Sequence, residues 1–418
     1  MENIVYWIWL SQACSPGSTT FGKLIKEFNG AKAIYEADGK KIASVIGYRT
    51  SDRSALENKN LDNAKAVYDF CKKRGVGIMT YNDDVYPDAL RKINDPPVLL
   101  YFRGQLPDFD KYPFVSAVGT RRLSDYGRRN AFKIGHDLAK AGVIVVSGMA
   151  EGIDGVAMAG ALSAGGVTVA IIGSGIDICY PAGHLKLARE IVKRGCVITE
   201  YAPGTKPIGH NFPKRNRIIS ALSSSTIVFE GPERSGALIT ARCAKEQGKT
   251  VYALPGNIGS SNSFVPNLLL KEGAKICTRA EDVLNDLSVK YTSLINTFNL
   301  NDKIGVDMMG ALHEYEVVAI CPSDDIFDTP KPWTTKKGLS PESNTEVVEP
   351  KVSVEPPQDF DKKSLILYKR IPQKGSCSIE SLVDEETPLR DVMRYILKLE
   401  VNGFVRLLPG ECVARKFK

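Results

Sequence analysis

The chain has 418 residues, of which 43% are hydrophobic, and it carries 55 Lys and Arg against 48 Asp and Glu. That length allows a packed core and exceeds one average domain, so two or three domains are expected. No apolar run reaches the roughly 18 residues of a membrane span and no secretory leader is visible, so we expect a cytoplasmic protein without a membrane partner. The nine cysteines are scattered and never spaced C-x-x-C, so we predict no disulfide framework and no thiolate metal site. We expect no metal and no cofactor.

The positive charge is concentrated in two segments. Residues 115–285 hold 21 Lys and Arg against 13 Asp and Glu, and residues 361–418 hold 12 against 8. A basic excess in a folded segment favours an anionic partner, although ordinary surface charge can produce the same totals.

Residues 1–85 are predicted to form a small N-terminal helical module. From Phe21 to Phe28 the apolar residues recur at the spacing of one helix face, and Gly30 follows; a second amphipathic helix runs to Gly75. Such a module can bind DNA or pack against its neighbour, and packing is the simpler expectation.

Residues 86–287 are predicted to form an α/β domain with a mostly parallel sheet. Short apolar runs alternate with stretches that have apolar residues at helical spacing, which indicates βαβ units with right-handed crossovers. Ligands of such sheets bind at the carboxyl ends of the strands. The predicted strands cover residues 98–102, 114–118, 143–146, 167–172, 196–199, 226–229 and 250–254.

Residues 288–360 are predicted to be a linker, because six prolines lie between Thr329 and Pro357 and no periodicity persists. The pattern allows a short helix at residues 306–312.

Residues 361–418 are predicted to form a winged-helix domain. Three expected helices are followed by an expected hairpin, which is the winged-helix order. The third helix mixes arginines with carboxylates, so contact with DNA and contact with protein fit it equally well. The helices cover residues 364–371, 378–383 and 388–401, and the strands cover 404–408 and 412–415.

Two loops of the central domain are predicted to cradle phosphates. Each precedes a helix, where free N–H groups and the helix dipole favour anions. In the first loop Asp154 is placed to cap the helix that follows. The residues expected in the two cradles are Ser147, Gly148 and Gly152 in the first, and Ser235, Gly236 and Thr240 in the second.

Two further segments are predicted to contact DNA. Arg121 can hold a phosphate with its guanidinium fork, and Phe212 can stack on a base while the cations beside it neutralise phosphates. The alternative for the second segment is a helix start in which Phe212 packs against the protein, and both can hold together. The expected contacts are Gly119, Thr120 and Arg121 in the first segment, and Phe212, Lys214, Arg215, Asn216 and Arg217 in the second.

Six short motifs occur in a fixed order along the central domain. They are Gly119-Thr-Arg, Ser147-Gly-x-Ala-x-Gly-Ile-Asp154, Gly173-x-Gly-Ile-Asp-x-x-Tyr-Pro181, Phe212-Pro-x-Arg-Asn-Arg217, Ser235-Gly-Ala-Leu-Ile-Thr-Ala241 and Pro255-Gly256. In this order they resemble the bacterial DNA-processing protein family DprA, also called Smf.

The resemblance implies an extended Rossmann-like domain flanked by an N-terminal helical module and a C-terminal winged helix. It implies a homodimer that binds single-stranded DNA and delivers it to the recombinase RecA in natural transformation. It carries over no catalytic residue, so we expect a protein that is not an enzyme.

The sequence departs from the family pattern at several positions. Met158 stands where the family usually has His, His184 where it has Asn, and Val265 where it has Gly. The basic residue that commonly precedes the Phe-Pro pair is also missing, and Lys206 is the nearest cation. We therefore add Lys206 to the expected DNA contacts.

A nucleotide-phosphate enzyme on the same fold is the main alternative. A dinucleotide dehydrogenase needs G-x-G-x-x-G after the first strand, which Gly119-Thr-Arg-Arg-Leu does not supply. The nucleoside-monophosphate phosphoribohydrolases show Pro-Gly-Gly-x-Gly-Thr followed by a catalytic Glu. Here Ser235-Gly236 is followed by Arg242-Cys243 without that Glu. A second alternative is an adaptor whose winged helix contacts a protein and whose central groove has degenerated.

Overall fold

The structure, a computed structural model, describes residues 2–48, 50–295, 317–321, 360–372, 377–384, 387–402, 404–408 and 412–415. The chain divides into two units, Met1–Thr334 and Thr335–Lys418. None of the helices in the described ranges is long and apolar enough to cross a membrane.

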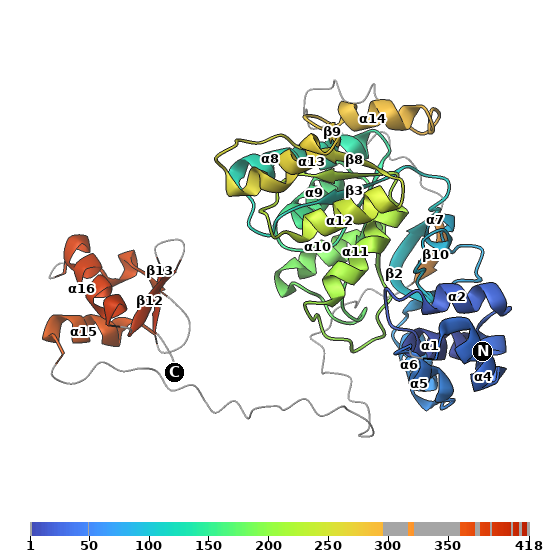
Figure 1. Cartoon of the computed structure of the whole chain (residues 1–418). Helices are drawn as coiled ribbons and strands as arrows, with labels where there is room; N and C mark the ends of the chain where they lie inside the picture. Colours follow the sequence, from blue (N-terminus) through green and yellow to red (C-terminus); the bar gives the residue numbers. More distant parts are fainter. Residues whose placement is uncertain are drawn as a thin grey trace. The chain divides into compact units, whose positions relative to one another are not determined.

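A ten-stranded sheet runs through the first unit (Figure 1). Its order is β1-β2-β6-β5-β4-β3-β7-β8-β9, and β10 pairs with the second half of β2. Neighbours from β6 to β9 are parallel, whereas β1, β6 and β10 pair with β2 antiparallel, so the predicted mostly parallel sheet is confirmed. The strands are β1 Gly77–Thr80, β2 Leu99–Pro107, β3 Phe114–Val118, β4 Ile144–Ser147, β5 Thr168–Ile171, β6 Cys196–Thr199, β7 Ser225–Val228, β8 Thr250–Ala253, β9 Lys275–Ile276 and β10 Val317–Cys321.

Helices cover both faces of the sheet because the side chains of each strand alternate between them. Phe114 and Val118 of β3 join the apolar cluster under α11, α12 and α13, whereas Val115 and Ala117 pack with α8, α9 and α14. The helices are α7 Asp88–Arg91, α8 Asp125–Lys140, α9 Ile153–Ser163, α10 Leu185–Arg194, α11 Asn211–Leu222, α12 Gly236–Glu246, α13 Phe264–Lys271 and α14 Glu281–Ser288, with 3-10 turns η1 Ala182–His184 and η2 Ser261–Ser263.

The N-terminal module is helical, as predicted, and shares its core with the sheet. Trp7 and Ile8 belong to one apolar cluster with Leu99 and Tyr101 of β2. The end of the predicted module is instead part of the sheet: Gly77 begins β1, and a Cβ there would lie 2.2 Å from the ring of Phe102. The helices are α1 Glu2–Ala13, α2 Thr20–Glu27, α3 Ala31–Glu36, α4 Gly39–Ile46, α5 Arg53–Glu57 and α6 Asp62–Lys73.

The predicted linker contains one described strand. Backbone hydrogen bonding to β2 incorporates β10 into the large sheet, which local sequence pattern did not predict. The helix expected at residues 306–312 lies outside the described residues.

The second unit has a three-stranded sheet in the order β11-β13-β12 and its own apolar cluster, which includes Ile371, Ile396 and Val413. The helix predicted at 378–383 is absent from the described part of this segment, where a short strand and a 3-10 turn occur instead. The winged helix therefore stays a prediction. The elements are α15 Lys362–Arg370, β11 Cys377–Ser378, η4 Glu380–Leu382, α16 Leu389–Val401, β12 Val405–Leu408 and β13 Cys412–Arg415.

Candidate nucleic-acid interface

A pocket of about 880 Å³ opens at the carboxyl ends of β3 and β7. These strands are neighbours, but the chain runs from β3 to β4 on one side and from β7 to β8 on the other. This reversal is the topological switch point, where open α/β sheets bind their ligands.

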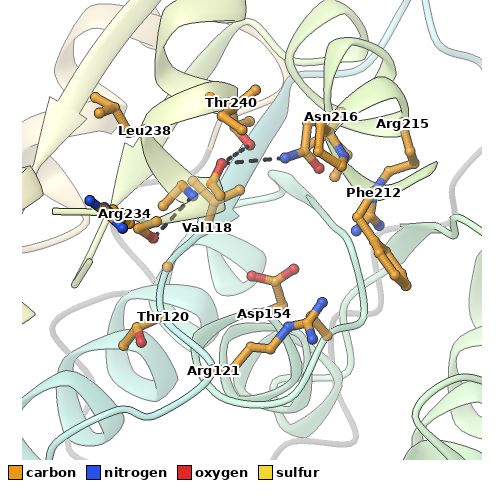
Figure 2. Close-up of a pocket in the computed structure, with 18 of the residues that line it drawn as sticks. Val118, Thr120, Arg121, Asp154, Phe212, Arg215, Asn216, Arg234, Leu238 and Thr240 are labelled. Atoms are coloured by element: carbon orange, nitrogen blue, oxygen red, sulfur yellow. Dashed lines mark hydrogen bonds between the residues drawn. The ribbon is translucent and has the colours of Figure 1, made fainter. Parts of the chain in front are cut away.

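Arginines dominate the charge of this pocket (Figure 2). Five of them line it, against two carboxylates, so an anionic ligand is favoured. The arginines are Arg121, Arg122, Arg215, Arg234 and Arg242, and the carboxylates are Asp154 and Glu233.

An aromatic platform lies at one side of the pocket. The guanidinium carbon of Arg121 is 5.3 Å from the ring centroid of Phe212, and the ring of Tyr180 is 5.5 Å from the same ring. Phe212 packs beside Gly173, where a Cβ would come within 3.1 Å of the ring. Since α11 starts at Asn211, the segment is a helix start, and Phe212 still lines the pocket. Phe212 therefore both packs against the protein at a helix start and remains available to a ligand in the pocket.

Two buried side chains of opposite charge, Arg215 and Asp154, lie near the platform. Arg215 is 4% exposed and donates to the carbonyl of Ile171, and its charge interacts with that of Asp154. Burial lowers the pKa of Arg215 to about 10, while Asp154 counteracts that change. Burial likewise raises the pKa of Asp154, and Arg215 opposes the rise. At neutral pH Arg215 remains positively charged and contributes to the potential of the pocket.

Asp154 does not cap α9 as predicted. The cap position belongs to Gly152, and the Asp154 carboxylate accepts a hydrogen bond from the Gly148 N–H at 3.1 Å. The acidic side chain therefore takes up a donor that we had expected an external anion to use.

The second predicted cradle does line the pocket. Ser235 caps α12 by accepting from the N–H of Ala237 at 3.2 Å. The Gly236 carbonyl accepts from Asn216 and Thr240, both at 3.3 Å, which ties α11 to α12 (Figure 2). A Cβ on Gly236 would have open space around it, so the backbone here is accessible to a ligand.

The first predicted cradle does not line the pocket. The Ser147 hydroxyl donates to the carbonyl of Ala117 at 2.6 Å, and the Gly148 N–H is bound by Asp154. The backbone of Gly152 packs closely against the neighbouring loop at Thr120 and Arg121. Internal hydrogen bonds thus use the Ser147 hydroxyl and the Gly148 N–H, which we expected to hold a phosphate, and we propose no DNA contact for Ser147, Gly148 or Gly152.

Three predicted DNA contacts also lie outside the pocket lining, namely Lys206, Lys214 and Arg217. Lys206 and Lys214 are exposed. Arg217 is buried, with its guanidinium 2.8 Å from a carboxylate oxygen of Glu200 and 2.9 Å from one of Asp95. Because its partners are internal, we assign Arg217 a structural role rather than contact with DNA.

Three departures from the family pattern, Met158, His184 and Val265, do not line the pocket either. Met158 is buried in α9, and Val265 is buried with its N–H bound to the carbonyl of Gly231 at 2.9 Å. Nδ1 of His184 lies 3.0 Å from the carbonyl of Met149. These three substitutions therefore change residues outside the pocket lining.

Among the lining residues that sequence reasoning missed are one aromatic and three cations, namely Tyr180, Arg122, Arg234 and Arg242. Tyr180 was visible within the third motif, and the arginines directly flank motifs that we did use. Their position beside a motif was the available signal. Only the folded loops bring them to one pocket.

Gly152 offers a test of how the pocket is supported. Its φ is +85°, and a Cβ would lie 2.2 Å from the carbonyl oxygen of Thr120 and 2.7 Å from the Cα of Arg121. We expect Gly152→Ala to lower the free energy of unfolding by at least roughly 1–3 kcal/mol, the cost of an unfavourable backbone conformation. Urea unfolding measures it, with Gly236→Ala as the control that should change little. Equal stability of the two variants would contradict this account.

The fold and the pocket define a doubly wound α/β protein with a basic ligand site at its switch point. Residues 77–288 match the family model of the DNA recombination-mediator protein A, and the chain belongs to this family. The resemblance to the DprA family is thereby confirmed.

Individual relatives agree with this assignment. The DNA processing protein DprA of Streptococcus pneumoniae is 40% identical over 243 residues, which cover 58% of this chain and 84% of the relative. Protein Smf of Synechocystis is 28% identical over 416 residues, covering 97% of each chain. An X-ray structure of DprA from Streptococcus pneumoniae aligns with a TM-score of 0.59 at 33% identity, covering 68% of this chain and 98% of the other.

Proposed function

We propose that this chain binds single-stranded DNA in the pocket at the ends of β3 and β7 and acts there as a recombination mediator. The observation that carries the proposal is the grouping of Arg121, Phe212 and Tyr180 within a pocket lined by further arginines. Unpaired bases present free faces to aromatic rings, and the phosphates between them attract guanidinium groups. A base-paired duplex keeps those faces stacked inside.

Binding of this kind should tolerate any base sequence. The pocket supplies stacking faces, cations and an accessible helix start at Gly236, and none of these requires a particular base edge. A mediator must accept whatever strand it meets, so sequence tolerance agrees with the role.

The partners in the reaction follow from the family. We propose that the bound strand is passed to the RecA recombinase, and that two copies of the chain form a homodimer whose two pockets raise avidity for one strand. In this role the chain acts by binding, without catalysing a reaction.

A nucleotide enzyme remains the second candidate because two carboxylates, Asp154 and Glu233, line the pocket. The raised pKa of the buried Asp154 is a feature that acid–base catalysts share. Incubating the protein with nucleoside monophosphates and measuring released base separates the candidates. Sustained release that Asp154→Asn abolishes would favour the enzyme.

Replacing Arg121 should weaken binding to all sequences and reduce its salt dependence. Each phosphate contact to a single strand contributes about 0.7 to the slope of log affinity against log salt. We therefore expect Arg121→Ala to lower the slope by about 0.7. Titration of labelled single strands at several salt concentrations measures both quantities. A wild-type protein that prefers duplex, or whose binding is independent of salt, would contradict the proposed function.

A further inference from the structure

The outer face of α8 combines cations with an exposed aromatic ring. Arg128 and Arg129 are exposed on this helix, and the side chain of Phe132, one turn further on, is 42% exposed. The opposite face of α8 packs inward through residues such as Ala131 and Ile134. We call the three exposed residues, Arg128, Arg129 and Phe132, the α8 surface.

The charges of the α8 surface are not neutralised within the described part of the protein. Neither Arg128 nor Arg129 forms an ion pair there, whereas Lys133 on the same helix pairs with Asp137 at 2.7 Å. A large exposed aromatic beside two free guanidinium groups matches the composition of the pocket itself.

The α8 surface follows directly from the pocket along the chain. Arg122 lines the pocket, and α8 begins three residues later. Ser124, which caps the helix, accepts from Gly127, and its own N–H donates to the carboxylate of Glu230 at 2.9 Å. This contact fixes the start of α8 beside the end of β7. Phe132 then lies about 10 Å along the helix axis from its first residue.

We propose that a single strand leaving the pocket continues over the α8 surface, with its phosphates near Arg128 and Arg129 and a base stacked on Phe132. This inference rests on the proposed function and extends it, because it makes the site longer than the pocket. Charge complementarity favours a polyanion as the occupant, and the exposed ring favours one with free bases. The α8 surface therefore acts only on strands long enough to reach it.

Strand length provides the test. Labelled oligonucleotides of about 6 and about 20 nucleotides, sizes that fill a short and a long single-strand site, are titrated with the full chain. The variants are Arg128→Ala/Arg129→Ala and Phe132→Ala. The control, Lys72→Ala/Lys73→Ala, removes two exposed cations from α6, outside both sites. Thermal unfolding of each variant checks that it is folded.

We expect Phe132→Ala to weaken binding of the long strand at least about fivefold, from the loss of one stacked base. The double arginine variant should lower the salt slope for the long strand by about 1.4, or about 0.7 per lost phosphate contact. Both variants should bind the short strand as the wild type does.

Unchanged binding of the long strand in both variants would overturn the α8 inference while leaving the pocket intact. Equal losses for both lengths in folded variants would also overturn it, since α8 would then belong to the pocket. Failure of the proposed function gives a different result: the wild type would not bind the short strand, or Arg121→Ala would bind it unchanged.

Discussion

Replacing Phe212 with alanine is expected to weaken binding of single-stranded DNA by about 5-fold to 150-fold, because stacking on an aromatic ring is worth about 1–3 kcal/mol per base. The ring contacts both Arg121 and Tyr180 at the pocket wall, so its loss also removes the surface against which Arg121 packs. Equilibrium titration with a short labelled strand measures the effect.

Two further variants show whether stacking is the cause. Phe212→Tyr keeps a flat ring and should retain most of the affinity. Phe264→Ala removes an aromatic that is 45% exposed and lies outside the pocket lining, so it should leave binding unchanged. If Phe212→Ala bound DNA with wild-type affinity, stacking on Phe212 would not contribute to binding, and the proposed function would lose its main support.

Replacing Arg217 with alanine is expected to lower the free energy of unfolding by about 3–5 kcal/mol, because it leaves a buried carboxylate without its partner. Arg217 joins α11 to Glu200, which follows β6, and to Asp95, which precedes β2. Urea unfolding measures the loss. Removing both charges in Arg217→Met/Glu200→Gln should cost less than Arg217→Ala alone.

The pH dependence of this loss has a definite sign. Burial raises the pKa of Glu200, and Arg217 is the main group that opposes the rise. Without Arg217 the folded-state pKa of Glu200 rises further above its unfolded value, so the variant loses stability as the pH increases through that range. The difference in the free energy of unfolding between wild type and Arg217→Ala should therefore shrink as the pH is lowered toward the ordinary pKa of glutamate.

Arg217→Ala also tests the assignment of roles on α11. If Arg217 contacted a phosphate, its removal would lower the salt slope of DNA binding and leave stability almost unchanged. We expect instead that Arg217→Ala lowers the stability and, under conditions where the variant is folded, leaves the salt slope of DNA binding almost unchanged. Arg121→Ala is the matched comparison, since Arg121 is exposed and its loss should affect binding with little change in stability.

Local sequence patterns were sufficient to predict strands β2 to β8 and their alternation with helices. Buried parallel strands such as β3 and β4 are continuous apolar runs, and α8 shows helical spacing, because side-chain direction follows backbone geometry. Three strands of the ten-stranded sheet were missed: β1 lies in the segment predicted to be helical, β9 has two residues, and β10 is held by pairing with a strand far away in the sequence.

The order of the glycine and arginine motifs determined the family, and with it the expectation that Arg121 and Phe212 contact DNA. Each motif requires particular residue types at a fixed spacing because it specifies a local backbone shape, so it can be recognised in the sequence alone. The tertiary structure alone decided what each cation of α11 does. Lys214 is exposed, Arg215 lines the pocket and its charge interacts with that of Asp154, and Arg217 binds Glu200 and Asp95. These partners lie up to 122 residues away along the chain, and whether a guanidinium meets a carboxylate or a phosphate depends on packing that no local pattern records.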